Sequence, residues 1–175
     1  MSLIVVIVFS LTNCEKANIQ RPGQKVYFQY NYINFAWGFQ HSGWLIDSSG
    51  NVYCYNKPEG WNYSDSTGII THAQMDSNLS ATSSVCYKID KNVLKEKIKL
   101  LYVASKGKIS EPSQEAYDAG AWEYSGYIYD SEKKIYKKVL LKQAGDIGIN
   151  NSSPAAVQLS NWFDSINYSI YHGKR

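Results

Sequence analysis

Several residue patterns that carry common enzyme chemistry are missing from this chain of 175 residues. No Cys-x-x-Cys pair is present, which excludes a zinc ribbon or a thioredoxin-type redox motif on spacing. No Gly-x-Ser-x-Gly sequence is present, so the nucleophile turn of the common serine hydrolases is missing. The three histidines, His41, His72 and His172, match no His-Glu-x-x-His or other metal-binding spacing. We therefore predict no cofactor, no metal site and no catalytic residues.

Concentrated positive charge is also missing. The formal net charge is +3, and lysines and arginines never form a run of five or more. The basic footprint of a nucleic-acid-binding protein is therefore absent from the sequence, and we predict no nucleic-acid partner. Lys91, Lys95 and Lys99 do share one face of a predicted helix, and such a face is either solvated or meets an acidic lipid or partner.

A long apolar run occurs only near the N-terminus. Leu3 to Leu11 is too short to cross a bilayer but has the length of a signal-peptide core, and Thr12-Asn13-Cys14 follows it. This segment resembles the precursors of bacterial lipoproteins, in which a cysteine after a short apolar segment is acylated and becomes the first mature residue. The resemblance covers about the first 15 positions, and it implies export, lipidation at Cys14 and a membrane tether in the bacterial cell envelope. The alternative is that Val5 to Phe9 forms a buried strand of the mature fold.

Cysteine itself is scarce, with three in the chain. If Cys14 carries lipid, an even pair remains, Cys54 and Cys86, and the simplest prediction is one disulfide between them. On the chain-entropy model such a bond contributes about 3 to 4 kcal/mol. Two reduced, buried cysteines on neighbouring strands are the alternative if the chain is cytosolic.

Tyrosine, by contrast, is abundant at 15 residues, and together with tryptophan it favours sheets over long helical bundles. The alternating runs 43–47 and 51–55 flank Ser48-Ser49-Gly50, which predicts a three-residue hairpin loop with a positive φ at Gly50. The resulting register places Trp44 opposite Cys54. The aromatic residues of 35–39 are expected to form a third strand, with a turn at 40–42.

Apolar spacing and capping residues predict the remaining elements. They are a first strand over 24–32, a strand over 84–89, a helix over about 91–106, a short helix over about 111–119, a second hairpin of 122–129 and 135–142, and a C-terminal helix over about 154–167. We predict a single α+β domain over 24–167, in which the helices pack on a mainly antiparallel, twisted sheet built from two hairpins. Residues 15–23 are then a tether that follows the signal-like segment 1–14, and 168–175 are a tail.

The longest irregular stretch, 57–83, is the first candidate for a binding surface. Loops of this length in compact domains are usually functional or disordered, and the predicted disulfide would clamp this one at its base. The stretch carries Trp61, a large apolar side chain without an obvious partner. The candidate ligand-binding residues are His41, Trp61, Tyr63 and His72.

These patterns favour an anchored envelope protein without catalytic activity, which binds an unknown envelope protein or a glycan. The alternative is a hydrolase of cell-wall or glycan material with a site near His41, Trp61 and His72, where rings stack on sugars and a carboxylate or histidine serves as acid and base. A cavity that gathers His41 or His72 with a carboxylate at hydrogen-bonding distance favours the enzyme, whereas a flat or filled surface favours binding. A third interpretation is an interaction module whose edge strand pairs with a partner.

Overall fold

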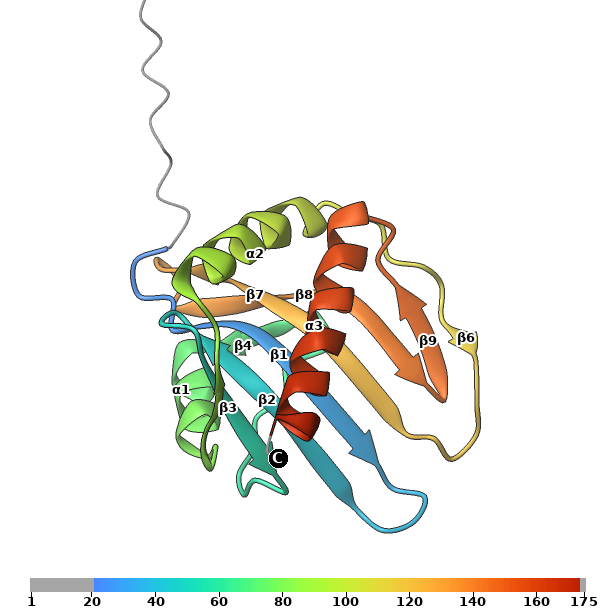
Figure 1. The fold of residues 1–175 in the computed structure, drawn as a ribbon. Helices are drawn as coiled ribbons and strands as arrows, with labels where there is room; N and C mark the ends of the chain where they lie inside the picture. The colour runs from blue at the N-terminus through green and yellow to red at the C-terminus, as the bar shows by residue number, and fades with distance from the viewer. Residues whose placement is uncertain (1–20, 174–175) are drawn as a thin grey trace, which may run out of the picture.

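The computed structural model describes residues 21–173, which form one mainly antiparallel sheet with helices on both of its faces (Figure 1). The strands are β1 (Val26–Asn34), β2 (Gln40–Asp47), β3 (Asn51–Asn56), β4 (Ile69–Thr71), β5 (Ser84–Lys88), β6 (Ser113–Gln114), β7 (Ala121–Asp130), β8 (Ile135–Gly145) and β9 (Ile147–Asn150). The helices are α1 (His72–Ser80), α2 (Lys91–Ala104) and α3 (Pro154–His172). The predicted α+β class and single domain are confirmed. Cys14, the signal-like segment 1–14 and residues 15–20 of the predicted tether lie outside the described residues.

The strand order is β5-β3-β2-β1-β7-β8-β9-β6, and β4 pairs with β8. The strands of each predicted hairpin are neighbours in this order, β2 with β3 and β7 with β8. The two hairpins meet through β1, which pairs with both β2 and β7. The first strand of the domain therefore lies in the middle of the sheet, and its side chains reach both faces between the hairpins.

The central hairpin has the predicted register. Trp44 lies opposite Cys54, and Gly50 has a φ of +85°. The Asp47 carboxylate stabilises the turn because it accepts hydrogen bonds from the backbone nitrogens of Ser49 and Asn51, both at 2.8 Å. This local chemistry sets which side chains of β2 and β3 point to each face.

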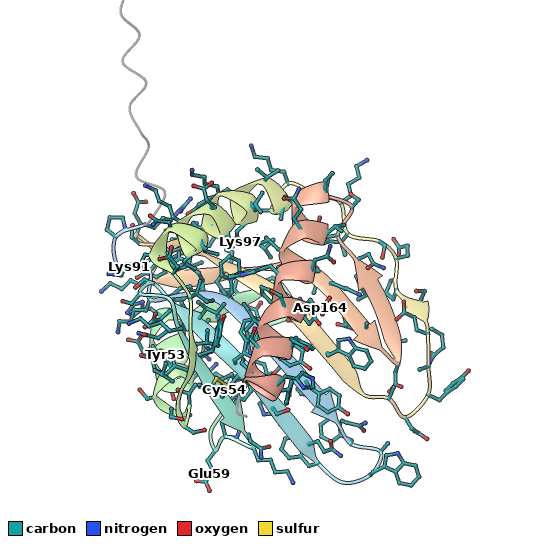
Figure 2. The ribbon with its side chains drawn as sticks, in the orientation of Figure 1. Tyr53, Cys54, Glu59, Lys91, Lys97 and Asp164 are labelled. Carbon is teal, nitrogen blue, oxygen red and sulfur yellow. A yellow bond between two sulfur atoms is a disulfide. The ribbon has the colours of Figure 1, made fainter. Side chains whose placement is uncertain are left out.

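Helices α2 and α3 cover one face of the sheet, which we call the helix-covered face. Asp90 and Ser153 cap the two helices by accepting hydrogen bonds from backbone N–H groups, and Pro154 occupies the first helical position of α3, as predicted. Figure 2 shows Lys97 of α2 and Asp164 of α3 on this side of the sheet. The Lys97 ammonium lies 5.5 Å from the centre of the Trp162 ring, so the two helices also contact one another.

Aromatic packing holds α3 on this face. Phe163 is fully buried, and its ring centre lies 4.7 to 5.8 Å from those of Trp44, Tyr124 and Phe28. These partners come from β2, β7 and β1, so one side chain of α3 connects both hairpins with the strand between them. Burial of a phenylalanine side chain contributes about 1.5 to 3 kcal/mol.

The opposite face, which we call the open face, is only partly covered. Helix α1 and β4 lie behind the sheet in Figure 1. There Ile70 and Met75 pack in a second apolar cluster with Tyr127, Tyr129 and Tyr136. Beyond α1 the sheet carries polar side chains instead.

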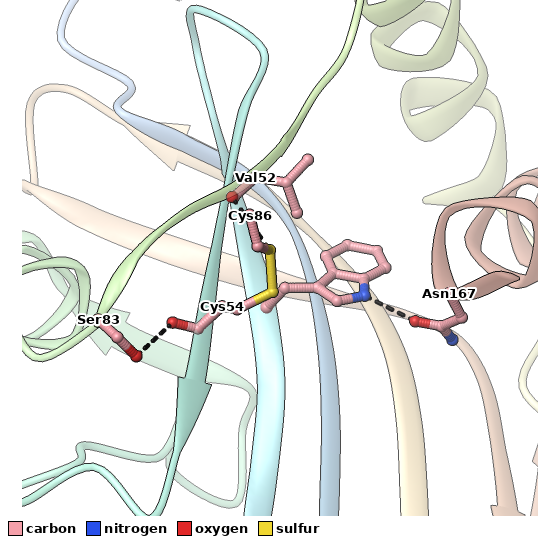
Figure 3. Close-up of a disulfide and its surroundings, with 6 residues drawn as sticks. Val52, Cys54, Ser83, Cys86 and Asn167 are labelled. Atoms are coloured by element: carbon pink, nitrogen blue, oxygen red, sulfur yellow. Dashed lines mark hydrogen bonds between the residues drawn. A yellow bond between two sulfur atoms is a disulfide. The ribbon is translucent and has the colours of Figure 1, made fainter. Parts of the chain in front are cut away.

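Cys54 of β3 and Cys86 of β5 form a disulfide (Figure 3). Their Cα atoms are 5.8 Å apart, and 32 positions of sequence separate them. The bond lies on the helix-covered side, near the hydrogen bond that Trp44 Nε1 donates to Asn167 Oδ1 of α3 at 2.7 Å. The segment between the two cysteines contains β4 and α1, which cover part of the open face. The disulfide therefore fixes both ends of this segment to the neighbouring strands β3 and β5.

The predicted third strand over 35–39 is wrong. β1 continues to Asn34 and β2 begins at Gln40, so the predicted turn at 40–42 is wrong as well. The Asn34 side-chain oxygen accepts a hydrogen bond from Ala36 N at 2.8 Å, and this contact turns the chain before another strand can begin. The aromatic side chains of 35–39 consequently project from the β1–β2 connection and are exposed.

The predicted short helix over 111–119 is also wrong. Most of this segment is irregular, and only Ser113 and Gln114 are extended, as the strand β6 that pairs with β9. Its side chains are polar or exposed, with Tyr117 exposed to 84%. A helix here would have had no apolar stripe to bury, so packing would not have stabilised it.

The stretch 57–83 is more regular than predicted, because it contains β4 and α1. Thr71 and Gln74 form a capping box that begins α1. The predicted tail is wrong over 168–172, since α3 continues to His172. At the other end, Arg21 of the predicted tether lies against the fold, where its Nη1 donates to the Tyr129 carbonyl at 2.8 Å.

Within residues 21–173, none of the helices has the length and apolar character needed to cross a membrane.

Candidate functional site

A cavity of about 250 Å³ lies on the open face, between the strands and the segment 61–64. Its floor is polar and comes from three adjacent strands, and its wall carries two aromatic rings. The floor includes Gln29 and Asn31 of β1, Glu123 and Tyr127 of β7, and Lys138 and Gln143 of β8, and the wall includes Trp61 and Tyr63. We call this space the inner cavity.

The register of the sheet explains why these polar groups share one face. Tyr55 lies opposite Gly43, Gly43 opposite Asn31, Asn31 opposite Glu123, and Glu123 opposite Gln143. Directly opposed residues of antiparallel strands point to the same face. A single row across five strands therefore carries a phenol, two amides and a carboxylate, with one glycine between them.

Because Gly43 has no side chain, the Tyr55 side chain can lie across β2 and reach β1. A Cβ atom at position 43 would lie 2.6 Å from the Tyr55 hydroxyl oxygen and 2.0 Å from the Tyr30 carbonyl oxygen. Without that atom, the phenol reaches β1 and donates to Asn31 Oδ1 at 2.8 Å. Glycine inside a strand often marks such a close approach.

A chain of hydrogen bonds fixes the floor of the inner cavity. The Tyr127 hydroxyl donates to Gln29 Oε1, and Gln29 Nε2 donates to the Tyr55 hydroxyl at 3.0 Å. Asn31 Oδ1 then accepts from Tyr55 and from His41 Nε2, which lies 2.9 Å away. These two bonds to Oδ1 hold the Asn31 amide in place, and its nitrogen makes no hydrogen bond within residues 21–173.

His41 is buried, and it is held in a neutral form. A carbonyl oxygen only accepts hydrogen bonds, so the contact with Asn31 Oδ1 places the imidazole proton on Nε2. Burial lowers the pKa of His41, which keeps the ring uncharged at neutral pH. The ring centres of Trp61 and Tyr63 lie 5.5 and 5.7 Å from that of His41, so the histidine connects the network to the aromatic wall.

Trp61 has partners after all. Its ring centre lies 4.2 Å from that of Tyr55, and Asn62, the next residue, is joined to α1. Asn62 N donates to Asn78 Oδ1 at 2.8 Å, and Asn78 Nδ2 donates back to Asn62 O at 2.7 Å. These reciprocal bonds fix the wall of the inner cavity against α1.

The charged groups of the inner cavity form one pair. Lys138 Nζ lies 2.9 Å from Glu123 Oε2, and the Ser125 hydroxyl donates to Glu123 Oε1 at 2.6 Å. Glu123 is the only carboxylate among the described residues that line this cavity. Both of its oxygens are engaged, so it is a structural anion that binds Lys138 and Ser125. Residues 21–173 also contain no cluster of histidine, cysteine or carboxylate side chains that is placed to hold a metal ion.

The structure brings together three of the four predicted ligand-binding residues. Trp61 and Tyr63 line the inner cavity and the buried His41 packs against both of their rings, whereas His72 lies at the start of α1 and contacts Asp76 at 3.3 Å. Lys25 binds the same Asp76 carboxylate at 2.7 Å, and the His72 ring stacks near Tyr136. His72 is therefore separate from the inner cavity, and the structure does not bring it together with the other three residues.

Sequence reasoning missed the polar floor. Gln29 and Asn31 are two positions apart in β1, a spacing that places both on one face of a strand. This spacing can be read from the sequence, but it does not show that the two amides face Glu123. Glu123 lies far along the chain, in the second hairpin. The β-bulge between Val26 and Phe28 also shifts the parity of β1.

The sheet also has an exposed edge at β5, which pairs only with β3 in the strand order. Val85 and Tyr87 of this strand are partly exposed. This is the geometry that strand addition by a partner requires, but β5 lies outside the inner cavity.

Searches of known protein families, curated proteins and solved structures found no match to this chain. Its function is therefore inferred from the inner cavity, its hydrogen-bond network and the disulfide.

Proposed function

We propose that this protein is a binding protein without catalytic activity, tethered to the bacterial cell envelope through Cys14, and that its ligand is a neutral sugar held in the inner cavity. The observation that carries this proposal is the engagement of both candidate acid–base groups. His41 Nε2 is bound to Asn31, and the Glu123 carboxylate is bound to Lys138 and Ser125. A floor that is already neutralised suits recognition by hydrogen bonds.

The chemistry of the lining supports a sugar. The amides of Asn31 and Gln143 both donate and accept hydrogen bonds, as hydroxyl groups do. Trp61 and Tyr63 offer flat apolar rings beside these polar groups, which matches the mixed surface of a sugar ring. At about 250 Å³ the cavity lies just below the range for ligand pockets, which begins at about 300 Å³, so we expect a single sugar unit to fill it.

The disulfide supports an exported protein. Disulfides form and persist in oxidising compartments and are rare in the reducing cytosol. Cys54 and Cys86 are bonded to each other, which leaves Cys14 as the odd cysteine that the lipoprotein-like segment assigns to lipid. Intact mass of the protein recovered from the membrane fraction tests this part. A non-lipidated protein with a full N-terminus in the cytosol would contradict it.

The hydrolase alternative has less support. Glycosidases commonly use two carboxyl groups across the scissile bond, and the described lining of the inner cavity supplies only Glu123. The nearby histidine contacts an amide, not a carboxylate. The pair that does join a histidine to a carboxylate, His72 with Asp76, lies on α1 away from this cavity.

Titration of the full-length protein with glucose and N-acetylglucosamine, followed by tryptophan fluorescence and calorimetry, tests the proposed binding. We expect saturable binding that Trp61→Ala abolishes, because Trp61 forms the wall. Tyr171→Ala is the matched control, since it removes an exposed ring from α3 far from the cavity lining. Hydrolysis of a glycosidic bond by the wild type, lost in Glu123→Gln, would establish the enzyme instead.

A further inference from the structure

A second cavity of about 560 Å³ adjoins the inner cavity, and we call it the outer cavity. The two share Ile33, Ala121 and Gln143, so they form one continuous groove on the open face. The five residues from Asn31 of β1 to Phe35 just beyond it span roughly 13 Å at the rise of an extended strand. The groove is therefore longer than one sugar ring.

A line of aromatic rings connects Tyr63 of the inner cavity with Phe35 of the outer cavity, through His41 and Phe39, which line neither cavity. The ring centre of His41 lies 5.7 Å from that of Tyr63 and 6.0 Å from that of Phe39, and Phe39 lies 5.3 Å from Phe35. Phe35 and Phe39 are exposed to 73% and 45%, so their faces are open to a ligand. Exposed apolar side chains gathered in one patch commonly mark an interaction site.

The outer rings are presented by a fixed turn. Asn34 Nδ2 donates to the Asp118 carbonyl at 3.1 Å, and Asn34 Oδ1 accepts from Ala36 N at 2.8 Å. The β1–β2 connection is thereby bonded both to itself and to the loop before β7. A ring held in place before binding loses less conformational entropy when a ligand arrives.

The charges along the groove disfavour an acidic ligand. Asp118 and Asp146 line the outer cavity, and none of the described residues around it is a lysine or arginine. In the inner cavity the one lysine is already paired with Glu123. Anionic chains would meet uncompensated negative charge, so the groove fits a neutral chain.

We propose that this groove binds a linear, neutral oligosaccharide, with one unit in the inner cavity and the following units against Phe39 and Phe35. This inference rests on the proposed function, because the inner cavity is the site of its first unit. It goes further in assigning Phe35 and Phe39 to ligand binding and in specifying a chain as the ligand.

Calorimetry with β-1,4-linked oligomers of glucose and of N-acetylglucosamine tests the proposal. We expect the wild type to bind a tetramer at least about tenfold more tightly than its monosaccharide, since each additional stacked ring is worth roughly a fewfold in affinity. Phe35→Ala with Phe39→Ala should lower the tetramer affinity to that of the monosaccharide and leave monosaccharide binding unchanged. Trp37→Ala is the matched control, because Trp37 lies on the same turn and is 79% exposed but neither lines the outer cavity, as Phe35 does, nor joins the row of ring contacts, as Phe39 does.

The outcomes separate this inference from the proposed function. Equal affinity for monosaccharide and tetramer, with both lost in Trp61→Ala, would overturn the extended groove and keep the inner cavity as a sugar site. Absence of binding to every sugar would overturn both. Tighter binding of an acidic oligogalacturonate than of a neutral tetramer would overturn the assignment of a neutral chain.

Discussion

The helix-covered face and the open face of this sheet are built from the same strands, yet they differ in chemistry. On the helix-covered face, alternate residues such as Trp44 and Tyr124 pack against Phe163 of α3. On the open face, the residues between them carry amides, phenols and an ion pair, as at Asn31 and Glu123. The comparison indicates that one face supplies most of the stability and that the other can hold polar groups for a ligand.

The largest expected effect concerns the helix-covered face. Phe163→Ala removes a fully buried ring that contacts three strands, and we expect it to lower the free energy of unfolding by about 3 to 5 kcal/mol. Urea denaturation measures the change. The variant should still bind sugar under conditions where it is folded. Loss of binding in a folded Phe163→Ala protein would contradict the division between the faces.

The disulfide should have the next largest effect. Cys54→Ser with Cys86→Ser opens a loop of 32 positions, and we expect a loss of about 3 to 4 kcal/mol in the free energy of unfolding on the chain-entropy model. Denaturation with and without a thiol reductant provides the comparison. The reductant should destabilise the wild type and leave the double variant unchanged, and an equal response of both proteins would refute the assignment.

Gly43→Ala tests the open face. The added Cβ would collide with the Tyr55 phenol and the Tyr30 carbonyl, so we expect a loss of about 1 to 3 kcal/mol together with a loss of sugar binding. Ser42→Ala, at the adjacent position of β2 whose side chain points to the other face, is the control and should leave binding intact. Normal binding by Gly43→Ala would show that the Tyr55 to Asn31 contact does not shape the site.

The smallest expected effect is a pH dependence from His41. Burial lowers the folded-state pKa of this histidine below the ordinary value of 6.5, so the unfolded chain takes up a proton first as the pH falls. The stabilising contribution is therefore fully present above pH 6.5 and is lost progressively below it, toward the folded-state pKa. Thermal unfolding of the wild type from pH 7.5 to 5.5 should show a falling Tm. His41→Gln should flatten this slope and His172→Gln should retain it, whereas an unchanged slope in His41→Gln would exclude the histidine as its source.

The parts of the fold that were predictable depend on local chemistry. Gly50 indicates a turn, and Asp90 indicates the start of a helix. Ser153 followed by Pro154 indicates the start of a second helix, and each of these residues acts on neighbours within a few positions. The helix predicted over 111–119 was wrong because it also relied on local residues alone. These residues resemble those at the end of a helix, but the segment has no apolar face that packing could bury and so stabilise a helix.

The site was less predictable because it depends on distant pairing. The pairing of β1 with β7 places Asn31 beside Glu123, and the residues near either position in the sequence do not predict this pairing. His72 was grouped with Trp61 because both lie in one irregular stretch. In the structure the chain crosses to pair β4 with β8, and this crossing takes His72 away from the inner cavity.

The disulfide also turns the chain from Cys54 to Cys86 into a closed ring, and this has a consequence for proteolysis. A protease that cuts once within this ring, for example in the loop that carries Trp61 and Tyr63, produces two fragments that stay covalently joined. Such nicked molecules would migrate as one species on a non-reducing gel and as two after reduction. A cut in the wall of the inner cavity would thus leave both halves of the molecule attached to each other.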